Sequence, residues 1–147
     1  MNEDNTDIDA VSEIFPWVLG PGYNEAQLLE LRRQEPFNAK MRITLNELGY
    51  TEAIRKRDTD RVMEISKVYV DQWLEFDPAY PGLHGYFQAA YWINRLTGGL
   101  VRHKRYEDAL YYLEIYFSRE WDVRFFASEK STNVKMRKRR ERVIALL

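Results

Sequence analysis

Two stretches of the chain, 48 positions apart, repeat the same arrangement of residues. Residues 45–57 read LNELGYTEAIRKR, and residues 93–105 read INRLTGGLVRHKR. In both copies an apolar helical pattern leads into a basic turn, and an acidic residue then precedes a second apolar pattern. This arrangement predicts two antiparallel helical hairpins that stack, because one hairpin alone cannot bury its apolar face. The identities between residues 45–69 and 93–117 are Asn46/Asn94, Leu48/Leu96, Lys56/Lys104, Arg57/Arg105 and Asp60/Asp108.

Capping residues and proline predict the boundaries of the first two helices. Asn24 and Gln27 have the spacing of a capping box, so a helix should begin there. Pro36 should end this helix, because proline lacks a backbone N–H and clashes with the preceding turn. Asn38 should cap the next helix, which Gly49 either ends or interrupts.

The remaining helices follow from apolar stripes and turn residues. Asp58 or Asp60 should cap a helix that the sequence DPAYPG at 77–82 ends. No stretch alternates apolar and polar residues as a strand does, so the fold is predicted to be all-α, a single domain of five or six helices. Its last three helices are expected over residues 84–102, from Tyr106 through Trp121, and over 133–146.

The second copy resembles a tetratricopeptide repeat. It reads INRLTGGLVRHKRYEDALYYLEIYF and is preceded by LEFDPAY. The resemblance, over residues 45–121, implies stacked antiparallel hairpins whose first helices line a concave surface. The side chains at the family's packing positions are Leu96, Leu100, Tyr106, Ala109 and Leu113.

The match departs from the family pattern in several places. Thr97 stands at the usual glycine position, and Arg61 stands where the first copy should carry a small residue. The spacing of 48 positions exceeds the family's repeat length of about 34. A generic helical bundle is therefore the alternative fold.

Both ends of the chain differ in composition from its middle. Residues 1–12 are acidic and are expected to be mobile, and residues 13–23 contain an apolar segment that either folds onto the core or docks elsewhere. Residues 128–147 form a basic helix or tail. The first residues lack the features of a signal peptide, and no apolar run approaches the ~20 residues that span a bilayer. A cytoplasmic protein with no membrane association is the expectation.

The sequence contains few candidates for catalysis. The absence of cysteine excludes disulfides, thiolate nucleophiles and Cys-based zinc sites. His103 and Glu107 are four residues apart but are expected to flank a turn, and the pair Gly98–Gly99 lacks the lysine and hydroxyl of a phosphate loop. We therefore expect neither an enzyme nor a cofactor.

Two groups of residues are candidates for binding. The first lies on the predicted concave face, where aromatic, amide and guanidinium groups can bind an extended or helical peptide. The alternative is that its aromatic residues are core and its arginines ordinary surface. The helix that begins at Tyr106 is apolar nearly all round, so it is either central or half of a homodimer interface. The predicted partner-binding residues are Tyr91, Asn94, Arg95 and Arg102, with Asn46 and Tyr50 from the first copy.

The second group is the basic run KMRKRRER at 135–142. Such a run can neutralise phosphates, an acidic partner or the acidic N-terminus of this chain. The pI of about 6.2 disfavours a dedicated nucleic-acid domain. The sequence thus favours a protein-interaction module (an adaptor, chaperone-like protein or assembly subunit), with a nucleic-acid-associated protein as the alternative. The bases of the run are Lys135, Arg137, Lys138, Arg139, Arg140 and Arg142.

Overall fold

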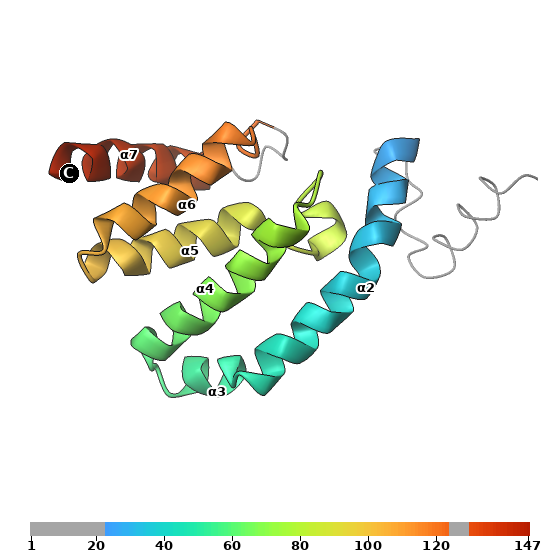
Figure 1. Cartoon of the computed structure of the whole chain (residues 1–147), viewed down its shortest axis with the longest axis horizontal. Coiled ribbons are helices and arrows are strands. Elements are labelled where there is room, and N and C mark those ends of the chain that lie inside the picture. The colour runs from blue at the N-terminus through green and yellow to red at the C-terminus, as the bar shows by residue number, and fades with distance from the viewer. Residues whose placement is uncertain (1–22, 124–129) are drawn as a thin grey trace, which may run out of the picture.

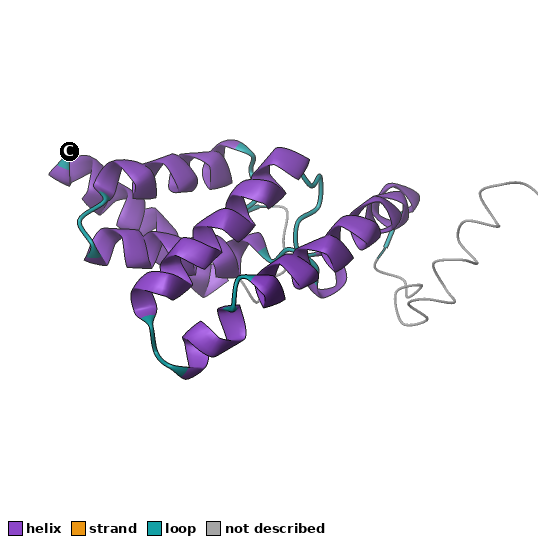
Figure 2. Cartoon of the chain, turned by 60° about the horizontal axis from the view of Figure 1, so that its bottom comes forward, coloured by secondary structure: helices purple, strands orange, loops and turns teal. Residues whose placement is uncertain are grey.

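Helices make up the described part of the chain, residues 23–123 and 130–147, in the computed structural model (Figures 1 and 2). No strand occurs in these residues, so the predicted all-α single domain is confirmed. The predicted acidic segment 1–12 and nearly all of the segment 13–23 lie outside them. The elements are α2 (Glu25–Glu47), α3 (Tyr50–Arg55), α4 (Thr59–Phe76), the 3-10 turn η1 (Leu83–Gly85), α5 (Ala89–Arg102), α6 (Tyr106–Ser118) and α7 (Lys130–Leu146).

The helices pack in chain order. Figure 1 shows α4, α5 and α6 following one another across the molecule, with α2 and α3 at one side and α7 at the other. Helices α5, α6 and α7 each contact the other two. Because α6 packs against both neighbours, it buries Tyr112, Leu113 and Tyr116, whereas Tyr111 remains exposed. The packing within one chain accounts for most of the apolar surface of this helix.

An aromatic cluster centred on Trp73 joins α2 and α4 to the segment that leads into α5. The Trp73 ring is stacked on Phe87 with centroids 5.2 Å apart and meets Phe37 edge-on at 4.8 Å. The indole is completely buried. The apolar side of α4 therefore faces the core, and aromatic side chains fill much of the interior.

Pro36 does not end a helix, contrary to the prediction. Helix α2 continues through it from Glu25 to Glu47, and Figure 1 shows this helix bending along its length. Phe37 stacks on Phe76 at 4.3 Å, and Met41 is fully buried. These contacts hold the second half of α2 against α4 and outweigh the cost of proline in a helix, about 3 kcal/mol. Asn38 is accordingly a buried helix-interior residue and not a cap.

Other predicted boundaries shift by a few residues. The capping box of Asn24 with Gln27 is present, and Asp58, not Asp60, caps α4 by accepting a hydrogen bond from the Arg61 N–H. Gly49, in the left-handed region at φ 78°, separates α2 from α3. Helix α5 begins later than predicted, at Ala89, helix α7 begins earlier, at residue 130, and α6 ends at Ser118, which leaves Trp121 in the following turn.

Helices α3, α5 and α6 end in the same way. Each is followed by one residue in the left-handed conformation: Arg57 (φ 56°), Lys104 (φ 59°) and Glu120 (φ 57°). Two backbone hydrogen bonds then close each turn as a Schellman motif. The donor–acceptor pairs are Arg57–Ile54 and Asp58–Ala53, Lys104–Val101 and Arg105–Leu100, and Glu120–Phe117 and Trp121–Tyr116.

The equivalent turns after α3 and α5 lie 47 residues apart, and not the 48 that separate the identical residues. Lys104 is the equivalent of Arg57, so the identical residues of the turns do not occupy equivalent backbone positions. At the offset of 47, Val62 and not Arg61 corresponds to Ala109. An exposed turn position accepts many residue types, whereas a position in the interior accepts few. Matching burial is therefore a better guide to equivalent positions than identical residues in a turn. The buried pairs at this offset include Val62/Ala109, Ile65/Tyr112, Ser66/Leu113 and Tyr69/Tyr116.

Lys104→Gly should raise the free energy of unfolding by up to about 1 kcal/mol. The left-handed conformation costs a non-glycine residue about 1–2 kcal/mol, and the extra chain entropy of glycine offsets part of this gain. Urea unfolding followed by circular dichroism measures the change. Lys104→Ala removes the same side chain but keeps Cβ, so its stability should stay within about 0.5 kcal/mol of wild type. If Lys104→Gly proves no more stable than Lys104→Ala, the left-handed conformation of Lys104 is not strained and the prediction is wrong.

Hydrogen bonds of Glu30 and Arg33 hold α2 against the loop that follows α4. Its carboxylate is nearly buried and accepts hydrogen bonds from Arg33 at 2.7 and 3.0 Å, from Gln34 at 3.1 Å and from the Ala79 N–H at 3.1 Å. Arg33 also donates to the Asp77 carbonyl at 3.0 Å. Burial opposes ionisation, but the hydrogen bonds outweigh it and hold the pKa of Glu30 below its usual value of 4.5.

The contribution of Glu30 should be lost in acid. Because its pKa is depressed in the folded state, the ionised carboxylate stabilises the fold above the unfolded-state pKa, and the effect disappears as the pH falls through the folded-state pKa. The difference in unfolding free energy between wild type and Glu30→Gln should therefore be largest at neutral pH and shrink below about pH 4.5. Denaturant titrations across this range measure it. A difference independent of pH would refute the linkage.

Candidate functional site

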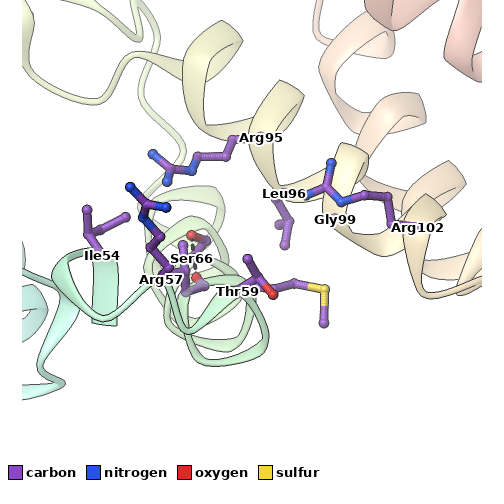
Figure 3. Close-up of a pocket in the computed structure, with 10 residues that line it drawn as sticks. Ile54, Arg57, Thr59, Ser66, Arg95, Leu96, Gly99 and Arg102 are labelled. Atoms are coloured by element: carbon purple, nitrogen blue, oxygen red, sulfur yellow. Dashed lines mark hydrogen bonds between the residues drawn. The ribbon is translucent and has the colours of Figure 1, made fainter. Parts of the chain in front are cut away.

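A pocket of about 310 Å³ lies where the turn between α3 and α4 faces α5 (Figure 3). Leu96, Val62 and Met63 supply apolar side chains, and Thr59 and Ser66 supply hydroxyls. Three arginines complete the lining, so the site is called the arginine pocket below. Its full lining is Ile54, Arg57, Thr59, Val62, Met63, Ser66, Arg95, Leu96, Gly99 and Arg102.

The three arginines come from two elements. Arg57 occupies the left-handed position of the turn after α3, whereas Arg95 and Arg102 stand two helical turns apart on one face of α5. Figure 3 shows the side chains of Arg57 and Arg95 pointing toward one another, with Arg102 on the other side of the pocket. The fold thus brings together bases that are separated by up to 45 positions in the sequence.

The positive charge of the arginine pocket is not neutralised within the described residues. No carboxylate lies at ion-pair distance from Arg57, Arg95 or Arg102, and no acidic residue lines the pocket. Most other described arginines are paired with carboxylates: Arg33, Arg55, Arg61, Arg105, Arg119, Arg137 and Arg140.

Two tyrosines predicted to bind a partner lie beside Arg95. The guanidinium of Arg95 donates a 2.7 Å hydrogen bond to the Tyr91 hydroxyl, and Tyr91 is 48% exposed. Tyr50, at the start of α3, packs against Trp92 with ring centroids 5.4 Å apart. Burial raises the pKa of Tyr50, so its phenol stays protonated at neutral pH. Four of the predicted residues, Tyr50, Tyr91, Arg95 and Arg102, therefore line the pocket or adjoin it.

The repeated asparagines have different environments. Asn94 accepts two hydrogen bonds from Arg139 of α7, at 2.9 Å through its carbonyl and at 2.8 Å through Oδ1. The Thr97 hydroxyl accepts a third at 2.9 Å. Asn46 is exposed near the end of α2. The identity of these residues in the two copies thus does not reflect one shared binding role.

Gly98 permits the close approach of α7 to α5. A Cβ at this position would lie 3.3 Å from Arg139 Nη2 and 3.7 Å from Arg102 Nη1. Both guanidiniums therefore lie close to Gly98 on α5. Burial lowers the pKa of Arg139, and the nearby charge of Arg102 lowers it further. Gly98 therefore has a packing role between α5 and α7.

The basic run of α7 divides into two groups. Arg137 pairs with Asp122 at 2.7 Å and Arg140 with Glu114 at 2.7 Å, while Arg139 is held by α5. Lys135, Lys138 and Arg142 are exposed. Half of the bases predicted to contact phosphates or an acidic partner are thus engaged within the domain.

Sequence reasoning missed Arg57 as a site residue. The basic turn KRD was noted, but which of its residues faces α5 depends on the left-handed backbone position. His103 does not pair with Glu107; its Nε2 lies 2.9 Å from Asp60 of α4. The described residues contain no group of three or more His, Asp or Glu side chains placed to hold a metal ion. Nor does any of their helices have the length and apolar character needed to cross a membrane.

Comparison with known proteins gave no match to a family model, to a curated protein or to a solved structure.

Asn94→Ala should destabilise the fold by about 1–3 kcal/mol, because it removes an acceptor from the half-buried Arg139 guanidinium. Asn46→Ala is the matched control, since this asparagine is exposed, and its effect should stay within about 0.5 kcal/mol. Chemical denaturation of both variants tests this. Equal effects at the two positions would show that the contact between α5 and α7 contributes nothing specific.

Proposed function

We propose that this protein is a non-enzymatic protein-interaction module that binds an acidic segment of a partner protein at the arginine pocket. The observation that carries the proposal is that Arg57, Arg95 and Arg102 line one pocket and have no carboxylate partner among the described residues. An acidic side chain would supply the missing charge, and charge-assisted hydrogen bonds to guanidinium groups are short and strong.

The surroundings of the pocket suit a peptide. The pocket combines cations with the apolar side chains of Val62, Met63 and Leu96, so it can hold an aliphatic stem together with an anionic group. Tyr91 and Ile54 are exposed beside it, at 48% and 37%. Exposed aromatic and aliphatic groups next to a charged pocket are typical of surfaces that contact residues on either side of an anchoring side chain.

The helical hairpins support the same proposal. Equivalent turns join α3 to α4 and α5 to α6, so the chain has two successive helical hairpins, as the resemblance to tetratricopeptide repeats implies. Stacked hairpins of this kind expose extended surfaces that bind peptide segments. The tail supports nucleic-acid binding less well, because Arg137, Arg139 and Arg140 are engaged within the domain.

Selection of short random peptides on the immobilised full chain tests the proposal. The enriched peptides should carry acidic residues next to aliphatic or aromatic ones. Arg95→Gln should weaken their binding about tenfold or more, as expected for the loss of one charged hydrogen bond. Fluorescence anisotropy with a labelled peptide measures the affinity.

Arg142→Gln is the matched control, because it removes the same charge from an exposed position on α7 outside the pocket. Its affinity should stay close to that of the wild type. Failure to enrich any peptide above the bare support would overturn the proposal. Equal losses in the two variants would show that only the overall charge matters and would refute this site.

A further inference from the structure

We infer that the anionic group recognised by the arginine pocket is a phosphate monoester on a side chain of the partner segment. This inference rests on the proposed function and specifies its ligand. One guanidinium already satisfies both oxygens of a carboxylate in a bidentate pair. The pocket is lined by three guanidiniums, with Arg57 and Arg95 facing one another, and the charge of about −1.5 to −2 of a phosphorylated Ser, Thr or Tyr compensates more of their positive charge than one carboxylate does.

The charge around the pocket favours an anion with more than one negative charge. Arg139 lies close to Arg102 over Gly98, and neutral oxygens alone accept its hydrogen bonds. The two nearest acidic residues of the turn are directed to other groups. Asp58 accepts the Arg61 N–H at 3.2 Å, and Asp60 lies 2.9 Å from His103 Nε2. A single carboxylate would leave most of the positive charge of this region uncompensated.

The size of the pocket favours a phosphorylated side chain over a free phosphate ion. A cavity of about 310 Å³ is at the lower limit for small-molecule sites and is far larger than one tetrahedral anion requires. The apolar side chains of Met63 and Leu96 provide a surface for the stem of the side chain. Ile54 and Tyr91, exposed next to it, can contact the flanking residues of the segment.

The experiment compares three peptide libraries on the full-length chain. The libraries have random flanks around a central phosphoserine, a central serine or a central glutamate, and inorganic phosphate serves as a fourth probe. Retention should be at least about tenfold greater for the phosphoserine library than for the other two, a difference equivalent to one strong charged contact. Inorganic phosphate should compete only weakly.

The turns supply a matched pair of variants. Arg57→Gly removes a pocket guanidinium and also relieves the left-handed strain at φ 56°, so the variant should be at least as stable as wild type. Lys104→Gly makes the same change of charge and backbone at the equivalent turn, outside the pocket. Retention of phosphopeptides should fall about tenfold or more in Arg57→Gly and remain unchanged in Lys104→Gly. Because neither variant should lose stability, unfolding cannot explain a loss of binding.

Each remaining outcome has a separate meaning. Equal retention of the glutamate and phosphoserine libraries, with loss in Arg57→Gly, would overturn the phosphate inference and leave the proposed function standing. Retention of none of the three libraries would overturn both. Inorganic phosphate that binds as tightly as the phosphopeptides would identify a small-anion site and refute the peptide as its source. Equal losses in Arg57→Gly and Lys104→Gly would also overturn the inference.

Discussion

The hydrogen bond that reverses the chain after α3 and after α5 determines the arrangement of the helices. In both turns an N–H bonds to a carbonyl five residues earlier, from Asp58 to Ala53 at 3.0 Å and from Arg105 to Leu100 at 2.8 Å. This bond requires one residue in the left-handed conformation, and the next helix then begins close to the end of the previous one. Because the two turns are alike, buried positions recur 47 residues apart and the hairpins can stack.

The same turn creates the candidate site. Arg57 occupies the left-handed position that the hydrogen bond requires, and the turn faces the side of α5 that carries Arg95 and Arg102. Lys104 occupies the equivalent position in the second turn but does not line the pocket. The chain therefore has two similar turns, and only the first combines with the arginines of the next hairpin. The site depends on the stacking of one hairpin on another and not on either hairpin alone.

Signals within a few residues predicted the helices well, and tertiary contacts explain the errors. The capping box of Asn24 with Gln27 is local and is present. Pro36 predicted a helix end, but the stacking of Phe37 on Phe76 overrides it. The offset of 48 came from five identities, two of which are bases in exposed turns where nothing fixes the residue type, whereas the burial of Ala109 and its equivalent Val62 gives 47.

The site was predicted only in part, because helical spacing can be recognised in the sequence whereas the conformation of a turn cannot. Arg95 and Arg102 share one face of α5, which the helical spacing of the sequence shows. Arg57 joins them only through the backbone conformation of the turn, for which arginine is an uncommon choice. The composition of the basic run likewise does not reveal which bases face the domain. Helical spacing gives a clue, because the buried Asn133, Met136 and Val143 follow one side of α7.

The basic helix and the arginine pocket are connected through α5. Arg139 is held by neutral acceptors, Asn94 and Thr97, so its charge is not cancelled where it lies. It approaches Arg102 because residue 98 is glycine, and a charge in a partly buried environment is less screened by water than one on the surface. The docked α7 therefore adds positive potential to the side of α5 that bears the pocket. Arg139 of the basic run is therefore part of the fold, and an anion bound by Arg102 would be attracted by its charge without touching α7.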